Sequence, residues 1–293
     1  MMNKIKNVIK KIIRYKSFKY IDIIKSRIAD DSLNNELHLC LAQAYFDIGN
    51  IDLAIACYRT ANYLGAEIDH KLMFQGKPDL FEFPVDQYVR YKVVADIINS
   101  KYRNISVLDV GGGAGRLGYF LPEQKYILAD INGSGITAIP LPFGNNSIDV
   151  ICTTDTLEHI PRSLREKFIS EMIRVAKKEI HIVVPTQLPP GYSDYNEFFY
   201  RITGAPETKE HIEYKVPTLN ELHLLLDPYK ESCDYEIKSC SSLITIPLLL
   251  CHYLVTNERY KMPEINRYFN KYFYNEIKNG SLPIEHHIKI EKK

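Results

Sequence analysis

The stretch VLDVGGGAGRLGYFL, residues 107–121, places a short apolar strand directly before a run of glycines and the start of a helix. A strand, a glycine loop and a helix in this order bring backbone amides and a helix N-terminus against a ligand. Side chains on the loop would keep that ligand at a distance, which explains the glycines. The pattern therefore predicts a small-molecule site at Gly111, Gly113 and Gly115.

The loop by itself is compatible with more than one ligand. Residues 113–118 satisfy the dinucleotide fingerprint G-x-G-x-x-G, which is a weak signal alone and also fits a purely structural loop. Asp109, at the end of the strand, suits a ligand with an ammonium group better than one with a pyrophosphate. Asp130, at the end of the next expected strand, can accept from both hydroxyls of a ribose. These residues leave NAD and S-adenosylmethionine open.

Strands and helices alternate after this loop, which indicates a mostly parallel sheet. We predict strands at 106–110, 126–130, 149–153 and 179–184, helices at 116–121 and 163–176, and a final antiparallel pair from DYEIKSC and HHIKIEKK with two helices inserted between them. The apolar run 243–255 is too short to span a bilayer and reads as a buried helix.

The segment LPFGNNSIDVICTTDTLEHIPRSLREKFISEMIRVAKKEIHIVVP, residues 141–185, strongly resembles the core of class I S-adenosylmethionine-dependent methyltransferases, the type-11 group in particular. In that group an LPF–x3–S–apolar–D unit, a D-x-L-E-H motif, a long helix ending in R-V-A and a strand follow one another. The resemblance covers roughly residues 85–293. It implies an α/β fold with a Rossmann-like, mostly parallel, seven-stranded sheet, helices on both faces, and S-adenosylmethionine as cofactor.

The resemblance also implies which residues contact the cofactor. The methionine part of the cofactor would contact Asp109, Gly111, Gly113 and Gly115, and the ribose would contact Asp130. The adenine would lie against Leu141 and Phe143 of the LPF unit. Thr154 and Asp155, at the end of a later strand, would close the methionine side. Two positions depart from the family pattern: INGSGI replaces the usual helix after Asp130, and Thr137-Ala138 stand where an acid near the adenine is often found.

A later segment, residues 196–222, resembles a subgroup in which a Tyr-rich helix and an E-H-x-E-x-x-x-P segment cover the mouth of the active site. We expect this cover at about 190–222. The same subgroup tends to have a shortened crossover after the second strand and often accompanies glycosyltransferases. That association points to a saccharide acceptor, by analogy only.

Two histidines are candidates for removing a proton from the acceptor. His159 follows Glu158 just beyond the third predicted strand, and His211 lies in the cover segment beside Glu210. Both also have a plain structural interpretation, as a loop cap and as an exposed charged turn. A metal site built from these residues is conceivable, but their spacing demands none, so the prediction contains no metal.

The N-terminal region is predicted to be a helical unit over residues 1–75, followed by the methyltransferase domain at 76–293. Residues 35–66 resemble a single tetratricopeptide repeat, with Ala42, Tyr45, Gly49, Ala54, Tyr58 and Ala61 at the expected places. One repeat cannot bury its own apolar face, so residues 3–29 are expected to supply a second, degenerate hairpin.

The first 28 residues carry a charge of +8, and the remaining residues carry −7. Ile5, Val8, Ile9, Ile12 and Ile13 share one face of a helix with lysines opposite. This helix either packs on its neighbours or contacts an acidic protein or an anionic membrane surface. The acidic remainder argues against nucleic acid as a partner.

The six cysteines show no metal-ligand spacing, which favours a reduced, cytoplasmic protein, with attachment to the inner membrane surface as the alternative. The function expected from these features is O-methylation of a sugar, or of a sugar-linked group, in a surface glycan or glycolipid precursor. The alternatives are a cofactor-binding scaffold without turnover, and a methyltransferase that acts on a protein or a small metabolite.

Overall fold

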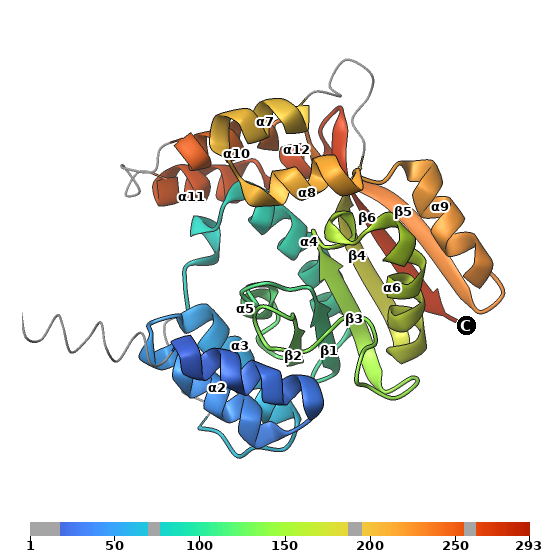
Figure 1. The fold of residues 1–293 in the computed structure, drawn as a ribbon. Coiled ribbons are helices and arrows are strands. Elements are labelled where there is room, and N and C mark those ends of the chain that lie inside the picture. Colours follow the sequence, from blue (N-terminus) through green and yellow to red (C-terminus); the bar gives the residue numbers. More distant parts are fainter. Residues whose placement is uncertain (1–17, 70–76, 187–194, 255–261) are drawn as a thin grey trace, which may run out of the picture. The chain divides into compact units, whose positions relative to one another are not determined.

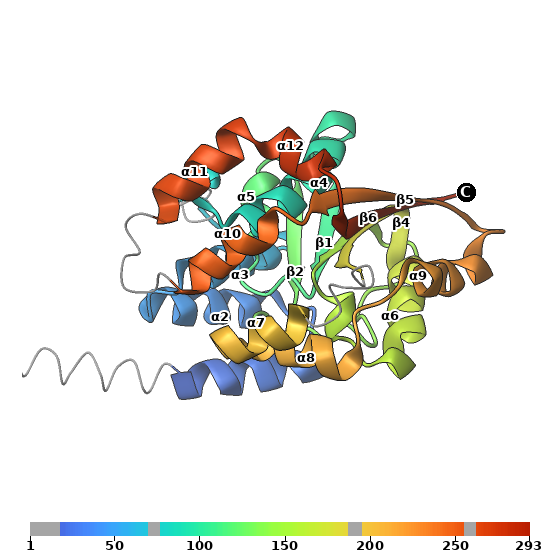
Figure 2. The same ribbon diagram turned by 90° about the horizontal axis from the view of Figure 1, so that it is seen from above.

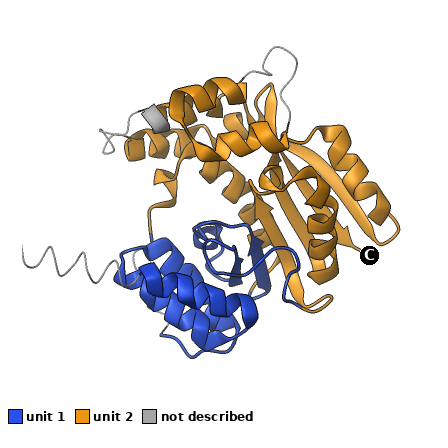
Figure 3. Ribbon diagram, in the orientation of Figure 1, with its two compact units in different colours: residues 1–77, 104–143 blue, residues 78–103, 144–293 orange. Residues whose placement is uncertain are grey.

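The computed structural model of the chain describes residues 18–69, 77–186, 195–254 and 262–293, without the side chains of 252–254. The chain divides into two compact units, each made of two separate segments (Figure 3). Unit 1 contains residues 1–77 and 104–143, and unit 2 contains residues 78–103 and 144–293.

Unit 1 contains helices and one pair of strands (Figure 1). They are a helix over residues 18–30, α2 (Asn35–Asp47), α3 (Ile51–Tyr63), β1 (Ser106–Val110), the short α5 (Leu117–Phe120) and β2 (Lys125–Ala129). Asn34 and Asn50 cap the N-termini of α2 and α3 by accepting from backbone amides, which is why each helix begins where it does. The expected pair of helices is present, and its relation to the tetratricopeptide repeat stays a prediction.

Helix α3 packs directly on β2, which pairs in parallel with β1 on its other side. The backbone amide of Leu128 donates to Oγ1 of Thr60 at 3.0 Å, so a helix side chain satisfies a group that the strand would otherwise leave unpaired. A Cβ placed on Gly115 would come within 2.4 Å of the Ala56 Cβ. The approach of α3 is therefore close enough to require glycine at position 115, where φ is also +74°.

The buried guanidinium of Arg59, also on α3, binds α5 and the chain that links α5 to β2. It donates to the carbonyl oxygens of Gly118, Leu121 and Gln124, the last two at 2.7 and 2.9 Å. It also lies 4.9 Å from the centre of the Tyr126 ring. Burial lowers the pKa of Arg59 to about 10, so the side chain remains charged at neutral pH.

Unit 2 contains four strands with helices on both faces (Figure 2). The strands run in the order β3 (Ile148–Thr154), β4 (Ala176–Pro185), β6 (Pro283–Lys292), β5 (Cys233–Ser242). β3 and β4 are parallel, whereas β6 is antiparallel to both of its neighbours. The predicted final antiparallel pair is thereby confirmed.

The helices of unit 2 lie above and below these strands. In Figure 2, α4 (Val85–Lys101) and α12 (Tyr274–Asn279) lie above β4 to β6, and α6 (Arg162–Val175) and α9 (Leu219–Leu226) lie below them. The remaining helices are α7 (Tyr195–Thr203), α8 (Pro206–Tyr214), α10 (Thr245–Leu254) and α11 (Met262–Tyr272), with short turns η2 (Leu80–Glu82), η3 (Leu157–His159) and η4 (Asp227–Tyr229).

The predicted α/β class is confirmed, with three corrections of detail. Within the described residues there are six strands rather than seven, because the chain around Thr137 forms turns and irregular structure. The apolar run 243–255 does form a helix, α10, but it is not buried: Ile244, just before it, is 48% exposed. Three helices, not two, lie between β5 and β6 in the described chain.

Other expectations from the sequence are only partly tested. Most of the basic segment, including Ile5, Val8, Ile9, Ile12 and Ile13, lies outside the described residues. The six cysteines are free thiols. Of the helices that the structure describes, none is both long and apolar enough to cross a bilayer. The domain boundary expected near residue 75 stays a prediction. The two compact units are defined by packing, and each combines two separate segments of the chain.

Replacing Arg59 by alanine would leave the carbonyl oxygens of Gly118, Leu121 and Gln124 buried without this donor. We expect a loss of about 3 kcal/mol in the free energy of unfolding, measured by urea denaturation. Arg116→Ala is the matched control, because Arg116 pairs with Asp52 of the same hairpin at 2.8 Å but is 37% exposed. That control should lose about 1 kcal/mol or less. Equal losses in the two variants would contradict the role given to Arg59.

Candidate active site

The glycine loop of unit 1 is held by the carboxylate of Asp130, which follows β2. The backbone amide of Gly113 donates to Oδ2 at 3.0 Å, and the amides of Asn132 and Gly133 donate to Oδ1 at 2.9 and 2.7 Å. The Tyr45 hydroxyl of α2 donates to the Gly133 carbonyl at 2.7 Å and holds the same turn from the other side. A carboxylate has about four acceptor positions, so these contacts leave room for a further donor such as a ribose hydroxyl.

The loop leaves open space above its own backbone at Gly113. A Cβ built there would meet no described atom within 4 Å, and φ is +52°. Gly111 and Gly115 also have positive φ, but the close neighbour of Gly115 is Ala56 of α3. The residues present thus fit a ligand over the loop at Gly113, whereas Gly115 is explained by packing between α3 and the loop.

Asp109 is completely buried beneath the loop, at the fourth position of β1. Its Oδ2 accepts from the Tyr126 hydroxyl at 2.6 Å, and its Oδ1 has no hydrogen-bond partner in the described part of the chain. A Cβ on Gly112 would overlap this carboxyl group at 2.2 Å. Burial raises the pKa of Asp109 to about 7, against the opposing effect of the Tyr126 hydrogen bond.

The structure distributes the predicted cofactor residues over both units. Leu141 and Phe143 are buried in unit 1, together with Asp109, Asp130 and the glycines. Thr154 and Asp155 belong to unit 2, at the carboxyl end of β3. The specific role of each residue, including the adenine contacts of Leu141 and Phe143, stays a prediction.

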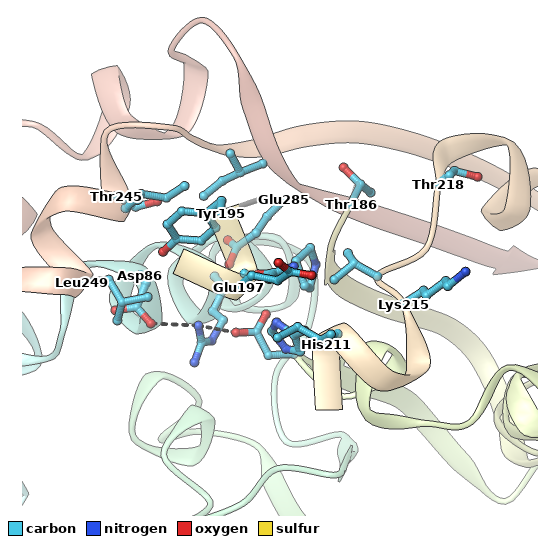
Figure 4. Close-up of a pocket in the computed structure, with 18 of the residues that line it drawn as sticks. Asp86, Thr186, Tyr195, Glu197, His211, Lys215, Thr218, Thr245, Leu249 and Glu285 are labelled. Carbon is cyan, nitrogen blue, oxygen red and sulfur yellow. Dashed lines mark hydrogen bonds and ion pairs between the residues drawn. The ribbon is translucent and has the colours of Figure 1, made fainter. Parts of the chain in front are cut away.

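A cavity of about 540 Å³ lies in unit 2 beside the carboxyl ends of β3 and β4 (Figure 4). Helices α4, α8 and α10 and the start of α7 contribute to its wall, so part of the segment expected at 190–222 lines this cavity. Its role as a cover stays a prediction. In open α/β sheets this end of the strands is where ligands bind. Its lining includes Asp86, Arg90, Asp155, Thr186, Tyr195, Glu197, His211, Lys215, Thr245 and Glu285.

An arginine and several acids form one wall of this cavity. Arg90 Nη1 lies 2.5 Å from Asp155 Oδ2 and 3.0 Å from Asp86 Oδ2. Asp155 has φ of +51°, an uncommon backbone conformation at the point where the chain leaves β3. Burial raises the pKa of Asp155 and of Glu285, and the charge of Arg90 opposes the rise at both.

The two predicted histidines are brought together, although they lie on different elements. His159 Nδ1 is 2.7 Å from Glu210 Oε2, and His159 Nε2 is 3.4 Å from His211 Nε2. Glu210 therefore partners His159 and not its own neighbour in sequence. Burial, with a smaller contribution from His159, lowers the pKa of His211 to about 4, so its imidazole is neutral at physiological pH.

Local sequence explains where α8 begins and ends and where α9 begins. Pro206 stands in the first turn of α8, where its missing amide hydrogen costs nothing. Thr218 and Glu221 form a reciprocal capping box that starts α9 directly after α8. Arg165 of α6 donates to the carbonyl oxygens of Tyr214 and Lys215, which fixes the end of α8.

Residues 121–184 match the sequence profile of a family described as a methyltransferase domain. The matched segment contains Asp130, Leu141, Phe143, Asp155 and His159.

This segment, less than half of the chain, is similar to a methyltransferase domain.

The protein is accordingly a methyltransferase enzyme.

Solved structures similar to the methyltransferase include three of different origin. The YcgJ protein of Bacillus subtilis is 16% identical, over 70% of this chain and 98% of that chain, with a TM-score of 0.43. Phosphoethanolamine N-methyltransferase 2 of Haemonchus contortus is 12% identical, over 78% of this chain and 60% of that chain, with a TM-score of 0.45. The plantazolicin methyltransferase BpumL is 14% identical, over 94% of this chain and 99% of that chain, with a TM-score of 0.44. Likeness of this size carries no information about the substrate.

Sequence reasoning missed several charged residues of the methyltransferase cavity. Asp86 and Arg90 are four residues apart on a predicted helix, a spacing that indicates an ion pair and was a readable signal. Nothing local marks Glu285, which lies in a terminal strand far along the chain. Glu158 was noted only as the neighbour of His159.

The raised pKa of Asp109 makes the stability of the methyltransferase depend on pH. An unfolded aspartate has a pKa near 4, so folding takes up a proton between about pH 4 and 7. Stability from this group is therefore greatest at low pH and is lost as pH rises towards 7. We expect the Tm of Asp109→Asn minus that of the wild type to grow from pH 5 to pH 7.5. A difference that stays constant over this range would refute the raised pKa.

Proposed function

We propose that the protein transfers the methyl group of S-adenosylmethionine to an oxygen of a saccharide, or of a sugar-linked group, in a surface glycan or glycolipid precursor. The cavity of unit 2 is the acceptor site in this proposal. The observation that supports it is the set of buried acceptor atoms without a hydrogen-bond partner among the described residues. They are Asp86 Oδ1 and Asp155 Oδ1, with Glu285 Oε2 from the opposite end of the chain.

Buried acceptor atoms are normally satisfied, and a ligand that fills this cavity has to bring donors. Saccharides carry several hydroxyl groups, each of which donates one hydrogen bond. A strongly anionic acceptor such as a free phosphate is disfavoured, because the acids of the lining outnumber its cations. The acids are Asp86, Asp155, Glu197, Glu221 and Glu285, and the cations are Arg90, Arg162 and Lys215. Tyr195 adds an aromatic side chain to the same cavity, and such rings pack on the apolar faces of sugars (Figure 4).

When bound, S-adenosylmethionine supplies a methyl group on a positively charged sulfur, and displacement by an acceptor oxygen leaves S-adenosylhomocysteine and a released hydroxyl proton. The protein's residues orient the acceptor and receive that proton. His211 lines the cavity and contacts His159, which Glu210 holds by its Nδ1. In this proposal the two histidines are the catalytic residues.

Two further expectations belong to the proposal. The basic N-terminal segment would bind a protein partner or an anionic membrane surface, and the protein would act in the cytoplasm or at the inner face of the membrane. Both rest on the charge pattern of the first 28 residues, most of which lie outside the described chain.

Cofactor binding is tested by calorimetric titration with S-adenosylmethionine, S-adenosylhomocysteine and NAD. We expect micromolar binding of the two adenosyl ligands and none of NAD. Asp130→Ala should abolish binding, and Asp130→Asn, which keeps an acceptor for the Asn132 and Gly133 amides, should weaken it by about tenfold or more. Asp47→Asn, on the exposed side of α2, is the control and should bind as the wild type does. Unchanged affinity in both Asp130 variants would remove Asp130 from the site.

The acceptor class is tested by transfer of a labelled methyl group to oligosaccharides, glycolipids, proteins and small metabolites. We expect label on saccharides, with His159→Ala and His211→Ala reducing kcat by about 100-fold or more while cofactor affinity stays the same. His223→Ala is the matched control, because His223 is exposed and contacts Tyr235 outside the cavity lining. Label on proteins or metabolites alone would overturn the saccharide proposal. Transfer to no acceptor would favour a scaffold without turnover.

A further inference from the structure

Three ligand atoms converge at the point where the chain leaves β3 and meets α8. Glu158 and His159 come from η3, and His211 comes from α8. The Nε2 atoms of the two histidines are 3.4 Å apart. Oε1 of Glu158 lies 3.8 Å from Nε2 of His159 and 3.9 Å from Nε2 of His211. One ligand atom from each residue thus falls in a triangle with sides of similar length.

These separations are too long for good hydrogen bonds and close to those of metal ligands. An N–H···N bond is weak at 3.4 Å, and distances of 3.8 Å or more are not hydrogen bonds. Two ligands of a tetrahedral zinc ion, each about 2.0–2.1 Å from the metal, lie about 3.3 Å from one another. A cation at the centre of the triangle would need its three ligands to move inward by about half an ångström or less.

Glu158 is the second observation that points to a cation. Its side chain is 1% exposed, and apart from its own backbone amide neither carboxylate oxygen has a hydrogen-bond partner in the part of the chain that the structure describes. A buried carboxyl group with so few donors is costly in either protonation state. Asp155 and Glu285 lie close enough to interact with it electrostatically, as do Arg90 and Arg165, so three acids, Glu158 included, stand against two arginines. A bound cation would satisfy Glu158 and reduce that surplus of acids.

The residues around the triangle also prepare the histidines as ligands. Glu210 binds Nδ1 of His159 at 2.7 Å, which places the ring proton on Nδ1 and directs the lone pair of Nε2 towards Glu158 and His211. A carboxylate behind a histidine ligand is the usual second layer of a protein metal site.

We propose that Glu158, His159 and His211 bind a transition-metal dication of the Zn²⁺ or Mn²⁺ class. Two imidazoles and one carboxylate favour these ions over Mg²⁺ and Ca²⁺, which prefer oxygen ligands. Three protein ligands leave coordination positions open, and His211 lines the acceptor cavity. Only one part of this inference rests on the proposed function: an acceptor hydroxyl would occupy an open position, where the cation would favour loss of its proton. Because the Nε2 atoms of both histidines would then bind the cation, that proton would pass to solvent water and not to a histidine.

The binding test uses the full-length protein, stripped with a chelator and titrated with Zn²⁺ and with Co²⁺, whose absorption spectrum reports its ligands. We expect one equivalent to bind at micromolar concentration or below and to raise the Tm. Glu158→Gln and His211→Ala should each weaken binding by about 100-fold, and Glu210→Gln by about tenfold. Glu207→Gln and His223→Ala, an exposed acid on α8 and an exposed histidine on α9, should bind as the wild type does.

Failure of the metal site and failure of the proposed function give different results. Absence of binding by the wild type, or equal binding by Glu158→Gln and His211→Ala, would overturn the metal site while leaving cofactor binding and methyl transfer intact. Metal binding with the expected variant pattern, but no methyl transfer to saccharides, would overturn the proposed acceptor alone. If both hold, a chelator should abolish transfer, and added Zn²⁺ or Mn²⁺ should restore it.

Discussion

The buried guanidinium of Arg59 joins the N-terminal helices to the glycine-loop half of the fold. It satisfies carbonyl oxygens of α5 and of the chain that follows it, while Thr60, next to it on α3, satisfies a backbone amide of β2. Tyr126, under the guanidinium, in turn holds Asp109 beneath the loop. The helical hairpin is therefore part of the wall that shapes the loop, and it covers β2 where the chain has no room for a crossover helix.

The secondary structure of the methyltransferase region was predictable because its signals are local. The strand at 106–110 and the helix expected at 163–176 follow from apolar periodicity, and the structure has them within one residue. The contact between α3 and β2 was not predictable, since it depends on Ala56 and Gly115 meeting across a long stretch of chain. A small residue on each side is a weak signal until the fold brings the two together.

The residues of the candidate site also differ in how far they could be predicted. Motifs that are contiguous in sequence, such as the glycine loop with Asp109 and the Glu158-His159 pair, were found from their own residue pattern. Long-range partners were not: Arg90 contacts Asp155, and Glu210 contacts His159, through the packing of α4 and α8 against the end of β3. Charge burial is also invisible in sequence, so nothing there showed that Glu158 is buried near Asp155 and Glu285 with no side-chain donor among the described residues.

The discontinuous make-up of unit 1 has a consequence for synthesis of the chain on the ribosome. Helix α3 ends at Tyr63, but the strand it covers does not begin until Lys125. At about 5–20 residues per second, the hairpin waits roughly 3 to 12 seconds for that strand to be made. During this interval the apolar side of α3 faces whatever else is near the nascent chain. The N-terminal helices are thus the segment for which a holding chaperone would matter most, and a slow codon cluster before residue 125 would lengthen their exposure.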